Sequence, residues 1–170
     1  MKLRITLLML GWLLVGARLA PAAEPVLRAF DSKTLAQVRS AQGSRPFVVV
    51  FWSVTCEPCR DELALLASLG RRYPGVRVLL VAADAPERRS AVLRTLAAFD
   101  LAGIELWQFG DEPAERIRYA VDRTWRGELP RTYFHDAHQR VTAYTGCVTP
   151  EEFEAWLASA SAPVPLNRAP

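Results

Sequence analysis

One stretch of this 170-residue chain carries most of its structural information: FVVVFWSVTCEPCR, residues 47–60. Its first six residues form an unbroken apolar run rich in β-branched and aromatic side chains, which predicts a strand buried on both faces. A helical pattern over Glu57–Arg72, with leucines at 63, 66 and 69, follows directly. The two cysteines therefore lie where a central strand passes into a helix.

The rest of the chain extends this alternation of strand and helix in both directions. Helices are expected over Ser32–Gln42, Pro86–Phe99, Pro113–Thr124 and from Thr149, and strands over Val76–Ala82, Ile104–Phe109, Thr132–Phe134 and Val141–Tyr144. Helical crossovers join parallel strands, whereas the last two strands are close enough to form a hairpin. The fold class is therefore α/β: a three-layer sandwich with a mixed central sheet and helices on both faces.

The N-terminal residues resemble a targeting segment. Lys2 and Arg4 precede a 13-residue, mostly apolar run, and Ala20-Pro21-Ala22 matches an A-x-A cleavage pattern. This predicts a secretory signal peptide over 1–22, with an uncleaved membrane anchor as the alternative. We expect a linker over 23–30, one domain over 31–159 and a disordered tail over 160–170.

Charge argues against nucleic-acid binding. The formal net charge is +3, and residues 1–22 hold three basic residues and no acidic one. The chain after residue 22 therefore has equal numbers of basic and acidic residues, which does not provide the basic surface that nucleic acids require.

The Cys56-Glu57-Pro58-Cys59 motif has the spacing of a redox pair. Three residues apart at a helix start, the two sulfurs come within disulfide range. The helix N-terminus lowers the pKa of the first thiol, and Pro58 in the first turn removes an N–H that lacks a helical partner anyway. Next to a βαβ pattern, this motif indicates thioredoxin-like redox chemistry.

The stretch 47–60 resembles the active-site strand and helix of the thioredoxin superfamily. A second segment, Gly127-Glu128-Leu129-Pro130-Arg131-Thr132, resembles the cis-proline segment of that family. With the leader and the long interval over 84–126, the likeness is to the TlpA/ResA-like periplasmic branch, and it covers about residues 31–158.

The resemblance implies a role for individual residues. Cys56 is the expected nucleophile, Cys59 the buried resolving cysteine, and Pro130 a cis-proline facing their disulfide. Leu129 is expected to pair with the substrate chain through its backbone, and Trp52 to pack beneath the site. The expected substrate-binding residues are Leu129, Trp52, Thr55 and Cys147.

The sequence also departs from the family pattern at two positions near the first cysteine. Thr55 stands where a tryptophan usually precedes that cysteine, and Val50 stands where thioredoxins carry a buried acid. These changes alter the expected surface and the expected route for the proton.

Glu57 and Pro58 are the other expected catalytic residues. The carboxylate of Glu57 opposes a thiolate on Cys56, which raises the thiol pKa and makes the couple more reducing. Glu57 is also a candidate to carry the proton of Cys59, because Val50 stands where thioredoxins have a buried acid. These points favour a reductase over an oxidase or isomerase.

No organic cofactor is expected beyond the redox-active Cys56–Cys59 disulfide. The resemblance implies two kinds of partner: disulfide-containing periplasmic proteins, such as those of cytochrome c or copper-site maturation, and a membrane electron donor for re-reduction. No nucleic-acid partner is expected.

Two other functional classes remain open from the sequence. A metal chaperone would use Cys56 and Cys59, with His135 and His138 completing four zinc or copper ligands, although solvated turn histidines are the default for that pair. A non-catalytic adaptor would keep only the fold. Cys147 is either a third reactive thiol or a small residue that fills a loop.

Overall fold

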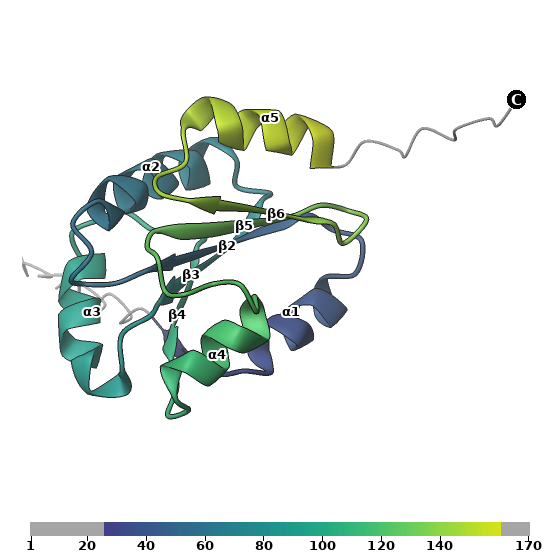
Figure 1. Ribbon diagram of the computed structural model, residues 1–170. Coiled ribbons are helices and arrows are strands. Elements are labelled where there is room, and N and C mark those ends of the chain that lie inside the picture. The colour runs from purple at the N-terminus through teal and green to yellow at the C-terminus, as the bar shows by residue number, and fades with distance from the viewer. Residues whose placement is uncertain (1–25, 161–170) are drawn as a thin grey trace, which may run out of the picture.

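The computed structural model describes residues 26–160, which form one six-stranded mixed sheet between helices (Figure 1). The strands are β1 Leu27–Phe30, β2 Phe47–Trp52, β3 Arg77–Ala82, β4 Glu105–Phe109, β5 Arg131–His135 and β6 Val141–Thr145. Their order across the sheet is β1-β4-β3-β2-β5-β6. The first four in this order are parallel, and β5 is antiparallel to both β2 and β6. The expected α/β sandwich and the hairpin are confirmed.

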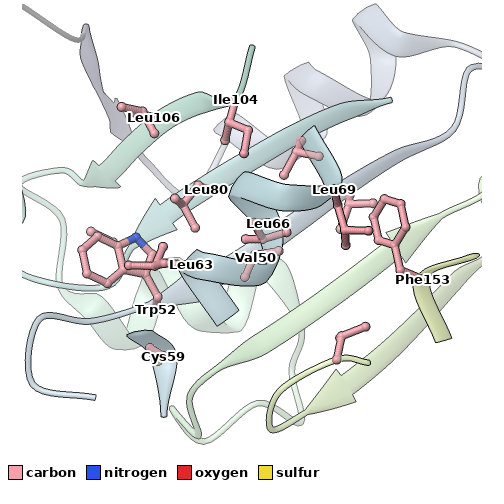
Figure 2. Packing of buried hydrophobic residues seen from close by; sticks show 14 of the residues in the cluster. Val50, Trp52, Cys59, Leu63, Leu66, Leu69, Leu80, Ile104, Leu106 and Phe153 are labelled. Atoms are coloured by element: carbon pink, nitrogen blue, oxygen red, sulfur yellow. The ribbon is translucent and has the colours of Figure 1, made fainter. Parts of the chain in front are cut away.

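Helices cover both faces of the sheet, as Figure 1 shows. They are α1 Thr34–Gln42, α2 Cys59–Arg72, α3 Arg89–Leu96 preceded by the short 3₁₀ helix η1 Pro86–Arg88, α4 Ala114–Val121 and α5 Pro150–Ala160. Buried side chains of α2, α3 and α5 share one apolar cluster, part of which Figure 2 shows. Those of α1 and α4 belong to a second cluster across the sheet.

Strand β2 is the centre of the molecule. All six of its residues are buried, with Val48, Val50 and Trp52 in the first cluster and the alternate residues in the second. An apolar side chain at every position is what a strand covered on both faces requires. α2 follows β2 after a six-residue connection. The first turn of α2 therefore lies close to a strand whose residues are all buried.

The predicted linker over 23–30 is wrong for its last four residues. Leu27–Phe30 form β1, which pairs in parallel with β4 at one edge of the sheet. The reason is burial: Phe30 is fully buried and its ring contacts those of Phe51 and Trp107. The domain therefore begins before residue 31, and at the other end α5 includes Ala160, one residue beyond the predicted boundary.

The predicted signal peptide over 1–22, the start of the linker and the predicted tail beyond Ala160 lie outside the described residues. Within 26–160, no helix has the length and hydropathy needed to cross a membrane.

Candidate active site

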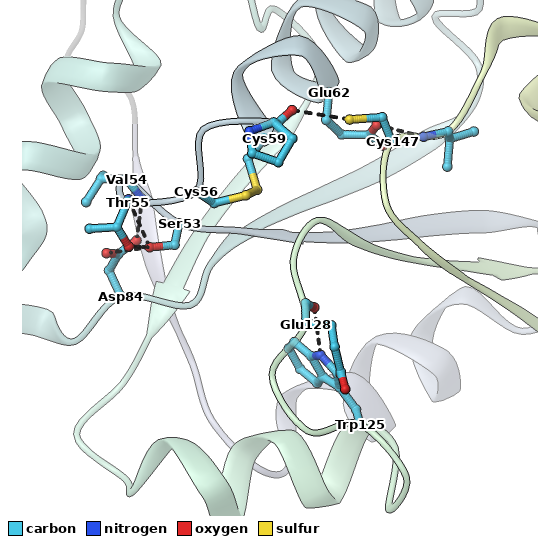
Figure 3. The surroundings of a disulfide bond; sticks show 12 residues. Ser53, Val54, Thr55, Cys56, Cys59, Glu62, Asp84, Trp125, Glu128 and Cys147 are labelled. Atoms are coloured by element: carbon cyan, nitrogen blue, oxygen red, sulfur yellow. Dashed lines mark hydrogen bonds between the residues drawn. A yellow bond between two sulfur atoms is a disulfide. The ribbon is translucent and has the colours of Figure 1, made fainter.

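A disulfide joins Cys56 and Cys59 at the end of β2 that leads into α2 (Figure 3). Cys59 is the first residue of α2 and is fully buried, in the same apolar cluster as Trp52. Cys56 lies three residues earlier, in a turn where its N–H donates to the Ser53 carbonyl, and it is half-buried. The pair thus has one accessible and one inaccessible sulfur, as the roles expected of them require.

The helix begins later than the motif pattern predicts. Pro58 is the N-cap of α2, and its carbonyl accepts the N–H groups of Asp61 and Glu62. Cys56 therefore precedes the first helical residue. Pro58 and Glu57 are both exposed, so they form the surface next to the accessible sulfur.

The expected cis-proline is present: the Leu129–Pro130 peptide bond is cis. Pro130 is buried, and its carbonyl accepts the Gly146 N–H at 2.9 Å. The next residue, Cys147, donates its thiol to the Pro58 carbonyl at 3.2 Å. This series of contacts brings the cis-proline segment, the loop after β6 and the Cys-Glu-Pro-Cys motif together.

Trp125 holds the loop that leads to the cis-proline. Its indole N–H donates to the Glu128 carbonyl at 3.0 Å (Figure 3), and its ring packs on Phe51. Half-buried Leu129 packs against both apolar clusters. Trp125 is only 5% exposed, so it supports this loop and offers little surface to a partner.

Thr55 and Trp52, both expected to bind substrate, differ in how far they are exposed to solvent. Thr55 is exposed, and its hydroxyl lies 3.0 Å from that of Ser53. Trp52 is 1% exposed, so it packs beneath the site, as expected, and cannot also contact a substrate. Its inclusion among the substrate-binding residues is therefore wrong.

A buried carboxylate that the sequence analysis did not identify lies on the first turn of α2. Glu62 is 1% exposed; it accepts the Val148 N–H at 2.9 Å and the Thr132 hydroxyl at 3.3 Å. Burial raises its pKa to about 7 in spite of these hydrogen bonds. Glu62 follows Cys59 by three residues, which puts both on one face of the helix.

Glu62 occupies the region that the acid missing at position 50 would reach. Val50 of β2 lies opposite Thr132 of β5, and Thr132 donates to Glu62. The buried carboxylate beside this part of the sheet therefore comes from α2, whereas β2 carries none. The sequence did hold a signal for it, because Glu62 continues the apolar stripe of Leu66 and Leu69 at helical spacing, where a carboxylate is unexpected.

A second buried carboxylate fixes the turn that carries Cys56. Asp84, 4% exposed, follows β3 and accepts the Ser53 hydroxyl and the Val54 N–H, both at 3.0 Å (Figure 3). Arg88 lies 3.7 Å from the same carboxylate. Nothing in the local sequence indicates this role, because Asp84 follows Ser53 and Val54 by 31 and 30 positions.

Cys147 is an exposed free thiol close to the disulfide. Desolvation, together with the nearby carboxylates of Glu62 and Asp61, raises its pKa. A thiol held in its protonated form is a weak nucleophile. The structure thus brings Cys147 to the site without activating it.

The structure does not assemble the alternative metal site. His135 pairs across strands with Phe47, at the start of β2, whereas the disulfide follows the end of that strand. His135 is also 1% exposed, so it is not a solvated turn residue, and burial lowers its pKa to about 4. Within residues 26–160, no group of three or more His, Cys, Asp or Glu side chains is arranged to hold a metal ion.

No protein-family model and no curated protein matches this chain in sequence. Solved structures do match it. A secreted Mycobacterium tuberculosis disulfide oxidoreductase homologous to E. coli DsbE superposes with a TM-score of 0.55 and 18% identity, covering 71% of this chain and 85% of the other. A thiol:disulfide interchange protein of the thioredoxin family from Chlorobium tepidum gives 0.57 and 17%, over 72% and 83% of the two chains.

A third match, the thio-disulfide isomerase of Thermus thermophilus, has a TM-score of 0.54 and 22% identity, over 73% of this chain and 84% of the other. At this level of identity the likeness establishes the fold. The strand order, the disulfide at the start of α2 and the cis-proline before β5 agree with it. The chain therefore has the thioredoxin fold.

Proposed function

We propose that the protein is an exported, TlpA/ResA-like thiol–disulfide oxidoreductase that reduces disulfides in periplasmic proteins. The observation that carries this proposal is the asymmetry of the pair, with Cys56 half-exposed in a turn and Cys59 buried on the helix face that also bears Glu62. The superposed proteins described as disulfide oxidoreductase and thiol:disulfide interchange protein support the same chemistry.

The proposed reaction moves two electrons from the dithiol to the substrate. The Cys56 thiolate attacks a substrate disulfide, forms a mixed disulfide and releases one substrate thiolate. Cys59 then gives its proton to Glu62 and attacks the Cys56 sulfur, which releases the second substrate thiolate and leaves the Cys56–Cys59 disulfide. A carboxyl group with a pKa of about 7 is matched to this transfer, because it can accept and return a proton near neutral pH.

The proposal includes a source of electrons. An oxidising compartment does not reduce the Cys56–Cys59 disulfide again, so each turnover needs a dithiol donor, which we assign to a membrane protein.

Reduction of insulin disulfides under dithiothreitol tests the activity. The full chain should accelerate the reaction, whereas Cys56→Ser should not. Cys59→Ala should retain the first step and accumulate mixed disulfides, which can be isolated from periplasmic extracts. Wild-type protein that matches Cys56→Ser in rate would rule out the enzyme and leave a non-catalytic adaptor.

Glu57 supplies the test of direction. Its exposed carboxylate follows Cys56 directly, and its removal should stabilise the Cys56 thiolate and so make the couple more oxidising. Each pKa unit on the thiol corresponds to about 1.4 kcal/mol, or roughly 30 mV. We expect Glu57→Gln to raise the reduction potential in glutathione buffers; an unchanged or lower potential would remove this argument for a reductase.

A further inference from the structure

A pocket of about 280 Å³ opens on the face of the sheet that α1 and α4 cover (Figure 1). The lining residues that matter here are Leu35 and Arg39 of α1, Val121 and Asp122 at the end of α4, and His135 and Val141, which pair across β5 and β6. Leu35 belongs to one apolar cluster and Cys59 to the other, so the pocket lies across the sheet from the buried cysteine.

His135 is the unusual residue in this lining. It is 1% exposed, the ring of Phe47 stacks on it with 4.2 Å between centroids, and neither of its ring nitrogens has a hydrogen-bond partner within residues 26–160. Burial lowers the pKa of His135 to about 4, so at neutral pH the ring has one N–H donor and one acceptor nitrogen. Buried polar atoms without a partner are rare in folded proteins. Because His135 lines the pocket, an occupant of the pocket can supply the missing partner.

Arg39 brings a positive charge to the same pocket. Its guanidinium donates to the side-chain and main-chain carbonyls of Gln139, at 3.3 and 3.4 Å, and both of these groups are neutral. No carboxylate of the described part of the chain forms an ion pair with Arg39. An arginine has five N–H donors, so the two bonds to Gln139 leave others for a ligand.

The carboxylates near the pocket are already neutralised. Asp122 accepts from the Arg131 guanidinium at 3.0 Å and from the Tyr133 hydroxyl at 3.2 Å. Asp136, whose charge also acts on His135, pairs with Arg140 at 2.6 Å. The charge that remains without an opposite partner is that of Arg39, and it favours an anion in the pocket.

The rest of the lining selects for a hydrocarbon group. Leu35, Val121 and Val141 are aliphatic, and Val141 is 44% exposed, one of three large hydrophobic side chains that the described residues expose to solvent. A ligand that covers Val141 gains the free energy of removing apolar surface from water. Pockets for drug-sized molecules measure about 300–1,000 Å³, so this one suits a smaller molecule.

We propose that this pocket is a binding site for a small organic carboxylate. One carboxylate oxygen accepts from the guanidinium of Arg39 and the other from the ring N–H of His135, while the hydrocarbon part covers Val141. The site uses none of the residues of the Cys-Glu-Pro-Cys motif, so it is additional to the proposed redox activity.

Titration with benzoate, followed by NMR, tests the proposal, and benzamide serves as a control ligand of the same shape without the charge. Benzoate should shift the ring nitrogens of His135 and the amide of Val141 to saturation, with a dissociation constant of about 1 mM or below. Benzamide should bind at least tenfold more weakly, because it offers Arg39 no charge.

Three variants locate the binding. Arg39→Gln should weaken benzoate binding at least tenfold and remove the preference over benzamide. Arg45→Gln removes the same charge from an exposed side chain just after α1, outside the pocket lining, and should keep the wild-type affinity. His135→Phe keeps a ring to stack on Phe47 and removes both nitrogens, so it should fold and bind benzoate several times more weakly.

Four results would overturn the proposal. Spectra that stay unchanged up to about 50 mM benzoate would mean that water alone serves the ring nitrogens of His135. Equal affinities for benzoate and benzamide would leave an apolar pocket without a carboxylate site. Equal losses in Arg39→Gln and Arg45→Gln would trace binding to net charge, and wild-type affinity in His135→Phe would exclude His135 from the site.

Discussion

At the level of single residues, the buried carboxyl of Glu62 makes stability depend on pH. Its pKa in the folded protein is about 7, above the ordinary glutamate value of 4.5, so the native state binds the proton more tightly than the unfolded chain does. Stability from this group is fully present below about pH 4.5 and is lost as the pH rises through 7. The displacement corresponds to about 3 kcal/mol as an upper value.

We expect Glu62→Gln to remove this dependence. Urea unfolding of both oxidised proteins gives their free energies of unfolding. Between pH 5 and pH 8 the free energy of the wild-type protein should fall relative to that of Glu62→Gln. The comparison isolates Glu62 because His135, which loses stability in the opposite direction as the pH falls from 6.5 toward 4, is present in both proteins. Parallel pH curves would contradict the proposed protonation of Glu62.

Cys147 gives a second test at this scale. Its thiol has a raised pKa and a weak hydrogen bond to the Pro58 carbonyl, so Cys56 and Cys59 should suffice for turnover. We expect the insulin-reduction rate of Cys147→Ala to be within twofold of the wild-type rate. Its reduction potential should differ from that of wild type by no more than a few millivolts. A tenfold loss of rate in a folded variant, about 1.4 kcal/mol of barrier, would make Cys147 a working part of the site.

At the level of elements, Asp84 links the segments that follow β2 and β3, on the amino-terminal side of Cys56. Removing a buried acceptor leaves the Ser53 hydroxyl and the Val54 N–H without their partner, which costs about 1–3 kcal/mol. Asp84→Ala should lose that amount in urea unfolding. Asp100→Ala is the matched control, because its ion pair with Arg71 is exposed on both sides and should contribute less than about 1 kcal/mol. Equal losses would show that the Asp84 contacts are not specific.

The comparison of these elements with the sequence shows which signals were strong. β2 and α2 could be predicted because every residue of one is apolar and the leucines of the other recur at helical spacing. β1 could not: it has four residues, and its buried positions, Leu27 and Phe30, are three apart, which is not the spacing of two that identifies a strand. Only its distant partner β4 makes it a strand.

The same distinction holds for the site. The Cys56–Cys59 disulfide and the cis bond before Pro130 could be predicted because each lies within a short sequence motif. Asp84 was missed because the residues it binds, Ser53 and Val54, are 31 and 30 positions away in the chain. Glu62 had a local signal, a carboxylate within an apolar helical stripe, but its partner Thr132 is 70 positions away.

At the level of the whole molecule, the position of β1 defines where the domain starts. A chain that begins at Asp31 lacks buried Leu27 and Phe30, each of which contributes about 1.5–3 kcal/mol by burial. We expect it to be less stable than a chain that begins at Pro25 by about 3–6 kcal/mol, a large share of the 5–15 kcal/mol typical of a domain. Equal midpoints in urea would show that β1 adds nothing and would restore the boundary predicted at residue 31.

The pairing of β1 with β4 also bears on the order in which the chain assembles. Leu27 lies opposite Leu106, so the first strand to be made waits for about 80 further residues before its partner exists. β2 and β3 are about 30 residues apart and can pair much earlier. Loop closure favours the nearer contact, and mixed sheets of this kind fold more slowly than helical bundles. The strands that flank the Cys56–Cys59 segment should therefore pair while β1 is still unpaired. Until β4, which ends at Phe109, has been synthesised, β1 stays accessible to chaperones and proteases.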